Sequence, residues 1–282
     1  MRLVLLTLLT LVAFAANSVL ARAALAEGAI GPGLFTALRL AAGAAMLLGL
    51  VELRRRRRGR AAPGLSGGWW PALMLLVYAA GFSFAYTGLA TGTGALILFG
   101  GVQVTMFAGA LAGGERPGPA RWAGAALALA GLGVLFAPGA AAPEPVSAAL
   151  MLAAAVGWGV YSLRGRAAGD ALGATAGNFL FASVPGLAIG LLAGEPAPGL
   201  AGVLLAVTSG AVASGLGYAL WYTVLPQLEA SVAAVAQLTV PLIALLGGML
   251  FLGEPATWRF AIAAALVLGG VGGAILLGRR RA

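Results

Sequence analysis

Apolar runs of about 20 residues recur along the whole chain, and the charged residues fall almost entirely in the short stretches between them. A helix that spans a bilayer needs about 20 apolar residues, so a chain of 282 residues has room for ten such helices with short loops. The composition agrees, because 61% of the residues are hydrophobic and only 9% are charged, far from the balance of a water-soluble domain. Ten helices leave no stretch for a soluble catalytic domain.

Pro, Gly and charged residues divide the chain into ten predicted membrane helices. Their approximate ranges are 3–21, 31–52, 69–89, 93–113, 121–138, 146–164, 173–193, 200–224, 231–252 and 258–277. Residues 4–16 also have the length of a signal-peptide core, with a cleavage site near residues 24–26. We favour a retained first helix, because the internal repeat described below requires it.

The distribution of arginine predicts the orientation of the chain. All 17 cationic residues are Arg, and with a cytoplasmic N-terminus fourteen of them lie on the inner side, against Arg22 and Arg259 on the outer side. This bias predicts a multi-pass protein of the inner (plasma) membrane with both termini in the cytoplasm. The run at residues 54–58 could bind anionic lipid or nucleic acid. Its place beside a predicted span favours a topology anchor with lipid contact, so we expect membrane lipid and no nucleic acid as a partner.

Missing residue types exclude much enzyme chemistry. The chain has no Cys, His or Lys, which removes thiolate nucleophiles, imidazole bases, their metal sites and Schiff bases. The eight acidic residues are scattered singly along the chain rather than clustered. We therefore expect no enzyme activity and no cofactor, and we keep a polytopic membrane enzyme only as a remote alternative.

Two stretches of the chain resemble each other at a separation of 136 to 139 residues. The matching pairs are Tyr86 and Tyr222, Glu115 and Glu254, and Trp122 and Trp258. The pattern predicts two repeats, residues 1–140 and 141–282, with five helices each. Because five is odd, the second repeat starts on the opposite side of the membrane, and the repeats must be inverted. Such a pair can alternate between two packings of similar energy, with a substrate site near the midplane.

Arg39 is the one charged residue that lies well inside a predicted span. A charge there costs about 2.5–3.5 kcal/mol on insertion scales, so it should face the interior of the bundle. Two interpretations stay open. The guanidinium could hold an anionic group of the substrate, or it could bridge helices through carbonyls and tyrosine hydroxyls.

Polar and aromatic residues in several other spans complete the predicted substrate site. They are Asn17, Tyr86, Gln103, Trp158, Tyr161, Asn178, Trp221, Tyr222 and Gln237. Each one alone could equally connect two helices, but their concentration favours one cavity lined by both repeats. Pro185 and Pro241 lie in the middle of predicted spans, where each should kink its helix.

The acidic residues near the ends of the predicted spans bear on whether the protein is coupled to protons. Glu115 and Glu254 occupy equivalent positions in the two repeats, and we expect them to cap helices or to pair with Arg116 and Arg259 rather than carry protons. Proton coupling stays open, with Glu229 as its candidate carboxylate. Nothing in the sequence indicates an oligomeric state.

Four short motifs resemble those of the EamA-like transporters of the drug/metabolite transporter (DMT) superfamily. They are Leu-Arg-Leu-Ala-Ala at 38–42, Gly-Glu-Arg at 114–116, Pro-Leu-Ile-Ala-Leu at 241–245 and Leu-Gly-Glu-Pro at 252–255. One departure is Val102, which stands where the first repeat would match Pro241. The resemblance implies a secondary transporter that exports a small metabolite, an amino acid or a related polar or amphipathic compound, by alternating access. An importer or a channel-like facilitator of small solutes is the alternative.

Overall fold

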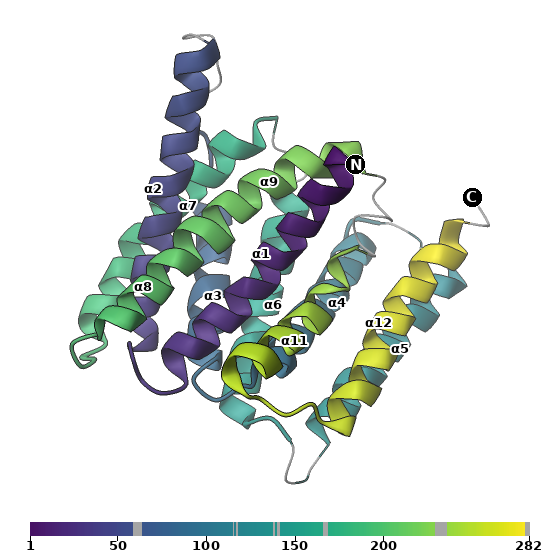
Figure 1. Ribbon diagram of the computed structural model, residues 1–282. Helices are drawn as coiled ribbons and strands as arrows, with labels where there is room; N and C mark the ends of the chain where they lie inside the picture. Colours follow the sequence, from purple (N-terminus) through teal and green to yellow (C-terminus); the bar gives the residue numbers. More distant parts are fainter. Residues whose placement is uncertain are drawn as a thin grey trace.

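The computed structural model describes residues 1–58, 64–114, 116, 118–137, 139, 142–165, 169–228 and 236–279. All regular secondary structure in these ranges is helical, and the helices pack side by side in one bundle (Figure 1). In chain order they are α1 (Arg2–Leu25), α2 (Pro32–Arg58), α3 (Trp69–Ala85), α4 (Thr91–Ala112), α5 (Pro119–Phe136), α6 (Pro145–Gly165), α7 (Ala171–Leu192), α8 (Leu200–Thr208), the π-helix η1 (Ser209–Leu216), α9 (Gly217–Val224), the 3-10 helix η2 (Leu225–Gln227), α11 (Val240–Leu252) and α12 (Trp258–Arg279). The predicted all-α class is confirmed.

The helices have the length and surface of a multi-pass membrane protein. Within the described ranges, seven are long and apolar enough to cross a bilayer, with residues 200–227 counted as one of them, and three shorter apolar helices accompany these. Large apolar side chains stand fully outside the bundle, among them Leu192, Leu250 and Phe251 with exposed fractions of 85%, 77% and 77%. Such a surface would aggregate in water but is stable against lipid tails.

Proline and glycine set several helix ends. Pro32, Pro119 and Pro145 begin α2, α5 and α6, where the missing N–H has no helical partner to lose. Gly253 ends α11 in the left-handed region, at a φ of 65°, which glycine adopts without a steric penalty.

Two of the predicted spans differ from expectation. Pro241 does not kink a continuous helix. It lies in the first turn of α11, which begins at Val240 after a turn at Leu238 and Thr239, so the ninth predicted segment is interrupted. The start of that segment, at residues 231–235, lies outside the described residues.

The eighth span is continuous, but its middle is the π-helix η1, a rare geometry that often marks functional positions. Pro185 lies inside α7 as predicted.

The bundle has two ends that carry different charges. The C-terminal part of α2, with its run of arginines, marks one end, which we call the Asp170 end after the residue that begins α7 (Figure 1). The start of α1 and the last turn of α12 lie at this same end. The connection from α11 to α12 lies at the opposite end, which we call the Glu254 end.

Helices from the two sequence halves interleave throughout the bundle. Residues before 140 supply α1 to α5, and later residues supply the rest. The closest cross-half pairs are α5 with α12, α2 with α7, α3 with α6, α4 with α6, α2 with η1, α1 with α11, α4 with α11, α3 with α7, and α1 with the span formed by α8, η1 and α9. Residues of both sequence halves therefore form one shared core.

Gly210 of η1 provides the closest approach between α2 and the eighth span. A Cβ at Gly210 would lie 2.2 Å from the Arg39 carbonyl oxygen and 2.8 Å from its Cα, so Gly210→Ala must push η1 away from α2. We expect it to destabilise the protein by about 1–3 kcal/mol, the usual range for overpacking, measured as thermal unfolding in detergent. The control is Gly49→Ala in α2, where no atom lies within 4 Å of the added Cβ. It should be neutral or slightly stabilising, and equal effects of the two variants would contradict the prediction.

Candidate functional site

A small cavity lies in the centre of the bundle, and we call it the central cavity. Its volume is about 20 Å³, which is room for about one water molecule. It is lined by Phe14, Asn17, Ser18, Tyr78, Phe82, Leu98, Phe99, Trp158, Ala213 and Tyr218. These residues come from α1, α3, α4, α6, η1 and α9, so both sequence halves form the wall. Aromatic rings dominate that wall, and none of the acidic side chains that the structure describes lines it.

Arg39 of α2 lies directly behind this wall. Its side chain is buried, with 1% exposed, and its guanidinium carbon stands 4.9 Å and 4.6 Å from the ring centroids of Tyr78 and Phe82. Its Nη2 donates to the Tyr78 hydroxyl over 2.7 Å, and its Nε donates to Ser214 Oγ over 3.3 Å. Its Nη1 is buried without a hydrogen-bond partner among the described residues. Arg39 is thus buried inside the bundle, as its place in the sequence predicted. One of its N–H donor groups makes no hydrogen bond to the described residues.

The network continues to Asn17 of α1. Asn17 Nδ2 donates to the Tyr78 hydroxyl over 3.3 Å, and Ser209 Oγ donates to Asn17 Oδ1 over 2.5 Å. Ser209 and Ser214 both belong to η1, whose wider π-helical turns bring these two hydroxyls to α1 and α2. Four elements therefore meet at Tyr78 and its neighbours through buried hydrogen bonds. Such a network specifies one arrangement of the helices.

A second polar cluster lies next to the first. Trp158 packs against Tyr78 on one side and stacks on Tyr161 on the other, with ring centroids 5.0 Å and 5.6 Å apart. Asn178 Nδ2 donates to the Tyr161 hydroxyl over 3.4 Å. Asn178 Oδ1 accepts from the backbone N–H of Gly68, 3.0 Å away, just before α3 begins. Trp158 thus joins the central cavity to contacts that lead toward the Asp170 end.

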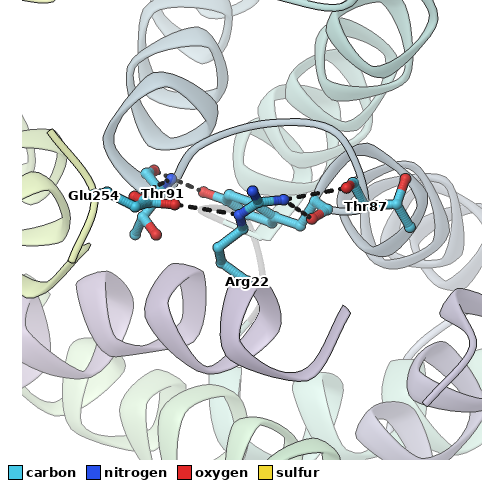
Figure 2. Close-up of polar contacts among 5 residues, drawn as sticks. Arg22, Thr87, Thr91 and Glu254 are labelled. Carbon is cyan, nitrogen blue, oxygen red and sulfur yellow. Dashed lines mark hydrogen bonds and ion pairs between the residues drawn. The ribbon is translucent and has the colours of Figure 1, made fainter. Parts of the chain in front are cut away.

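The Glu254 end is closed by an ion pair between the two halves, which we call the Glu254 closure. Arg22 Nε lies 3.2 Å from Glu254 Oε1, and Arg22 Nη1 donates to the backbone carbonyls of Tyr86 and Thr87, each 3.1 Å away. The other carboxylate oxygen of Glu254 accepts from the Thr91 backbone N–H over 2.8 Å and so caps α4. Figure 2 shows Arg22 reaching between Glu254 and the segment that carries Thr87. One arginine and one carboxylate thus connect α1, the α3–α4 connection and α11.

This finding corrects part of the prediction for the acidic residues. Glu254 does cap a helix and pair with an arginine, but its partner is Arg22 and not Arg259. Arg259 instead donates to the carbonyl of Ala137. Glu115 and Glu229 lie outside the described residues.

Glu195 makes a second contact between the halves near the same end. Its carboxylate oxygens accept from the backbone N–H groups of Gly33 and Leu34, over 2.7 Å and 2.9 Å, at the start of α2. The residue follows α7 in the sequence, so an acid from the second half caps a helix of the first, as Glu254 does. A carboxylate is favoured at such a position because the free N–H groups carry partial positive charge.

The Asp170 end is closed by a different set of contacts, which we call the Asp170 closure. Arg54 makes a two-pronged ion pair with Asp170, with Nη1 and Nη2 lying 2.7 Å and 2.6 Å from Oδ1 and Oδ2. This hydrogen bonding holds the pKa of the Asp170 carboxyl below its usual range. Beside it, Ser66 N donates to the Gly173 carbonyl over 3.2 Å, and the backbone at Ser66 packs directly on Gly177 of α7, where a Cβ would not fit.

The structure brings some of the predicted site residues together and separates others. Asn17 and Trp158 line the central cavity, Arg39 contacts its wall, and Tyr161 and Asn178 form the second polar cluster. Four further predicted residues do not line the cavity: Tyr86, which is buried against the wall residue Phe82, Trp221, which packs on the wall residue Phe14, and the half-buried Gln103 and Gln237. Tyr222 packs at the edge of the core, and its hydroxyl interacts with Tyr161.

Sequence reasoning missed the residue at the centre of the network. Tyr78 contacts Arg39, Asn17 and Trp158, yet it was not among the predicted residues. A tyrosine in the middle of an apolar span is the same signal that selected Tyr161, so it could have been found. Ser209 and Ser214 carried no such signal, because serine is common in membrane helices. No group of three or more metal-binding side chains occurs in the part of the chain that the structure describes.

Comparison with known proteins identifies the family. The model of the EamA-like transporter family matches residues 146–276, and a Pseudomonas aeruginosa protein, "Uncharacterized protein PA1977", is 51% identical over 272 residues, which is 96% of this chain and 93% of that protein. The chain belongs to the EamA-like transporter family, within the DMT superfamily. This confirms the resemblance that the four motifs indicated.

A solved structure has the fold of this EamA-like protein. It is described only as "Crystal structure of protein", is 25% identical in sequence, and matches with a TM-score of 0.66 over 97% of this chain and 98% of its own. Members of the EamA-like family are transporters rather than enzymes. Membership therefore indicates a membrane transporter of small solutes.

Proposed function

We propose that this EamA-like protein is a secondary transporter that exports a small polar or amphipathic metabolite, an amino acid or a related compound, across the bacterial inner membrane by alternating access. The observation that carries the proposal is the central cavity, lined by both halves and separated from each end by contacts between the halves. A cavity of about 20 Å³ cannot hold a metabolite, so binding requires the halves to move apart. A cavity this small supports a carrier over a channel-like facilitator, which needs a continuous path wide enough for its solute.

The pattern of helix contacts supports two inverted repeats of five helices, residues 1–140 and 141–282. A twofold axis would relate α1 to α6, α2 to α7, α3 to the eighth span, α4 to α11 and α5 to α12. Each contact between helices of the two halves should then occur a second time, between the two helices to which the axis maps them. The contact of α3 with α6 corresponds in this way to the contact of α1 with the eighth span. The contacts of α4 with α6 and of α1 with α11 form a second such pair. Repeats related in this way can alternate between two packings of similar energy.

The charges support an orientation with both termini in the cytoplasm. The arginines of α2 and the start of α1 lie at the Asp170 end, which would face the cytoplasm under the positive-inside rule. The Glu254 end would then face outward. Export from the cytoplasm would begin with opening of the Asp170 closure and finish with opening of the Glu254 closure.

Transport measurements with two substitutions test the site. We expect Arg39→Ala to lower solute counterflow in proteoliposomes by about tenfold or more, the scale of a lost hydrogen bond to a charged group. Trp158→Ala should lower it to a similar extent, because it removes a large aromatic ring from the cavity wall. The solute is chosen by comparing metabolites released into the medium by cells with and without the protein. Saturable counterflow would itself distinguish a carrier from a pore.

Two exposed residues of the same types serve as matched controls. Arg56→Ala and Trp258→Ala remove side chains that are 76% and 77% exposed and lie away from the cavity. Both should leave counterflow unchanged. Unchanged counterflow in Arg39→Ala and Trp158→Ala would instead remove the central cavity as the transport site.

A further inference from the structure

Among the described residues, no carboxylate balances the positive charge of Arg39. The ion pairs in the described part of the chain join Arg22 to Glu254, Arg54 to Asp170 and Arg56 to Glu52, and none includes Arg39. Its partners are neutral: two hydroxyl groups and the faces of two aromatic rings. A charge buried in a low-dielectric interior is strongly favoured by an opposite charge close to it. The unused Nη1 group is the donor that such a charge would find.

Several hydrogen-bond acceptors around the central cavity already accept from neighbouring groups. Asn17 Oδ1 accepts from Ser209, and the Tyr78 hydroxyl oxygen accepts from both Arg39 and Asn17. The Tyr78 oxygen has two lone pairs, so its own proton is left to be donated, and the hydrogen bond from the guanidinium makes that proton a stronger donor. Ser214 Oγ also accepts from Arg39. The wall therefore offers the Tyr78 proton as a donor, and the Tyr218 hydroxyl of the same wall has no hydrogen-bond partner among the described residues.

The rest of the wall is apolar and aromatic. Phe14, Phe82, Leu98, Phe99 and Trp158 offer no charge and suit a hydrocarbon or ring. A solute that fits both parts has an anionic head and an apolar body. An ammonium group would meet the unbalanced Arg39 charge without a carboxylate to offset it.

We infer that the substrates are organic monocarboxylates with an apolar body, taken in preference to zwitterionic amino acids and to cationic amines. In this arrangement the carboxylate accepts hydrogen bonds from Arg39 Nη1 and the Tyr78 hydroxyl, while the apolar body packs on the aromatic wall. The inference rests on the transport function proposed above; within its amphipathic metabolites it favours monocarboxylates over the amino acids named there. Arg39 then sets specificity by its positive charge, which disfavours a solute that carries a second, positive group.

Three probes with the same phenylethyl skeleton separate the charge classes. They are 3-phenylpropionate, phenylalanine and phenethylamine, which carry an anion, a zwitterion and a cation. Binding to the purified full-length protein in detergent is measured by thermal stabilisation and by quenching of tryptophan fluorescence. We expect 3-phenylpropionate to bind most tightly, phenylalanine more weakly and phenethylamine least. Absence of binding by the anion, or tighter binding by either other probe, would overturn the inference.

Variants show whether Arg39 is responsible. Arg39→Gln should weaken 3-phenylpropionate binding by about ten- to a hundredfold, the range of a lost hydrogen bond to a charged group, while Arg56→Gln at an exposed position should not change it. If Arg39→Gln does not fold, Arg39→Lys provides the test instead. Lysine keeps the positive charge, so the three probes should keep the same order of affinity, and a changed order would overturn the inference. Equal affinity in Arg39→Gln and the parent would overturn the inference.

Counterflow with the same probes separates this inference from the proposed function. Binding of 3-phenylpropionate that depends on Arg39, without counterflow, would contradict transport and leave the anion site standing. Saturable counterflow of phenylalanine or phenethylamine, without binding of 3-phenylpropionate, would support transport and overturn the substrate class.

Discussion

Replacing Glu254 with glutamine should open the Glu254 end of the bundle and expose the central cavity from that side. Glutamine keeps the shape of the side chain and can still accept from the Thr91 N–H, but it loses the charge that holds Arg22. We expect a shift of about 1–2 kcal/mol toward the open state, which changes the population about five- to thirtyfold. Because the chain has no cysteine, Ser18→Cys supplies a single thiol in the cavity wall. Its reaction with a membrane-impermeant reagent added outside the cell measures the opening.

The matched control is Glu27→Gln, an exposed acid just after α1 near the same end. It changes net charge equally and should leave the labelling rate of the cavity thiol unchanged. An unchanged rate in the Glu254→Gln protein would mean that the ion pair with Arg22 does not hold this end closed. Faster labelling in both variants would indicate a general effect of charge.

We expect a corresponding substitution at the Asp170 end to expose the central cavity from that side. Asp170→Asn removes one charge of the two-pronged pair with Arg54, and we expect the same cavity thiol to react faster from the cytoplasmic side, measured in inside-out vesicles. The shift should again be about 1–2 kcal/mol, because both side chains are mostly shielded from solvent. Glu52→Gln is the control, since its pair with Arg56 is largely exposed and should contribute little. No change from the cytoplasmic side in Asp170→Asn would show that this end is held by other contacts.

The pH dependence of this pair has a definite sign. Hydrogen bonding from Arg54 lowers the pKa of Asp170 in the closed arrangement relative to a free carboxyl group. The stabilisation is therefore present above the ordinary carboxyl pKa of about 4 and is lost as the pH falls through the lowered value. Labelling from the cytoplasmic side should thus be constant from neutral to mildly acidic pH and rise only in stronger acid. A rise near neutral pH would point to another titrating group.

The fold was largely predictable because the bilayer imposes a simple rule on the sequence. Every backbone polar group must be paired within the membrane, so each apolar run of about 20 residues becomes a helix, and its ends follow from Pro, Gly and charge. The predicted ranges 93–113 and 173–193, for example, correspond to α4 (Thr91–Ala112) and α7 (Ala171–Leu192). The prediction for Pro241 failed, because the same residue can kink a helix or begin one, and the sequence does not distinguish these.

The site was predictable only in part. Arg39 was recognisable from the sequence because a charge inside an apolar span costs free energy whichever face of the helix carries it. Tyr86, Gln103, Trp221 and Gln237 satisfied the same polar or aromatic criterion as Asn17 and Trp158, yet none of the four lines the cavity. Polarity within a span shows that a residue needs a partner, but it does not show which face of the helix carries it or which helix lies opposite.

The sequence by itself determined the membrane location, the helical class and the family, since these follow from local hydropathy and short motifs. Only the tertiary structure decided which groups meet: Arg22 with Glu254, 232 residues apart, Asn17 with Ser209, 192 apart, and Arg54 with Asp170, 116 apart. The physical reason is that the rotation and neighbours of each helix are fixed by packing among all of them. The hydrogen bonds and ion pairs that enclose the cavity depend on that packing, and no single segment encodes it.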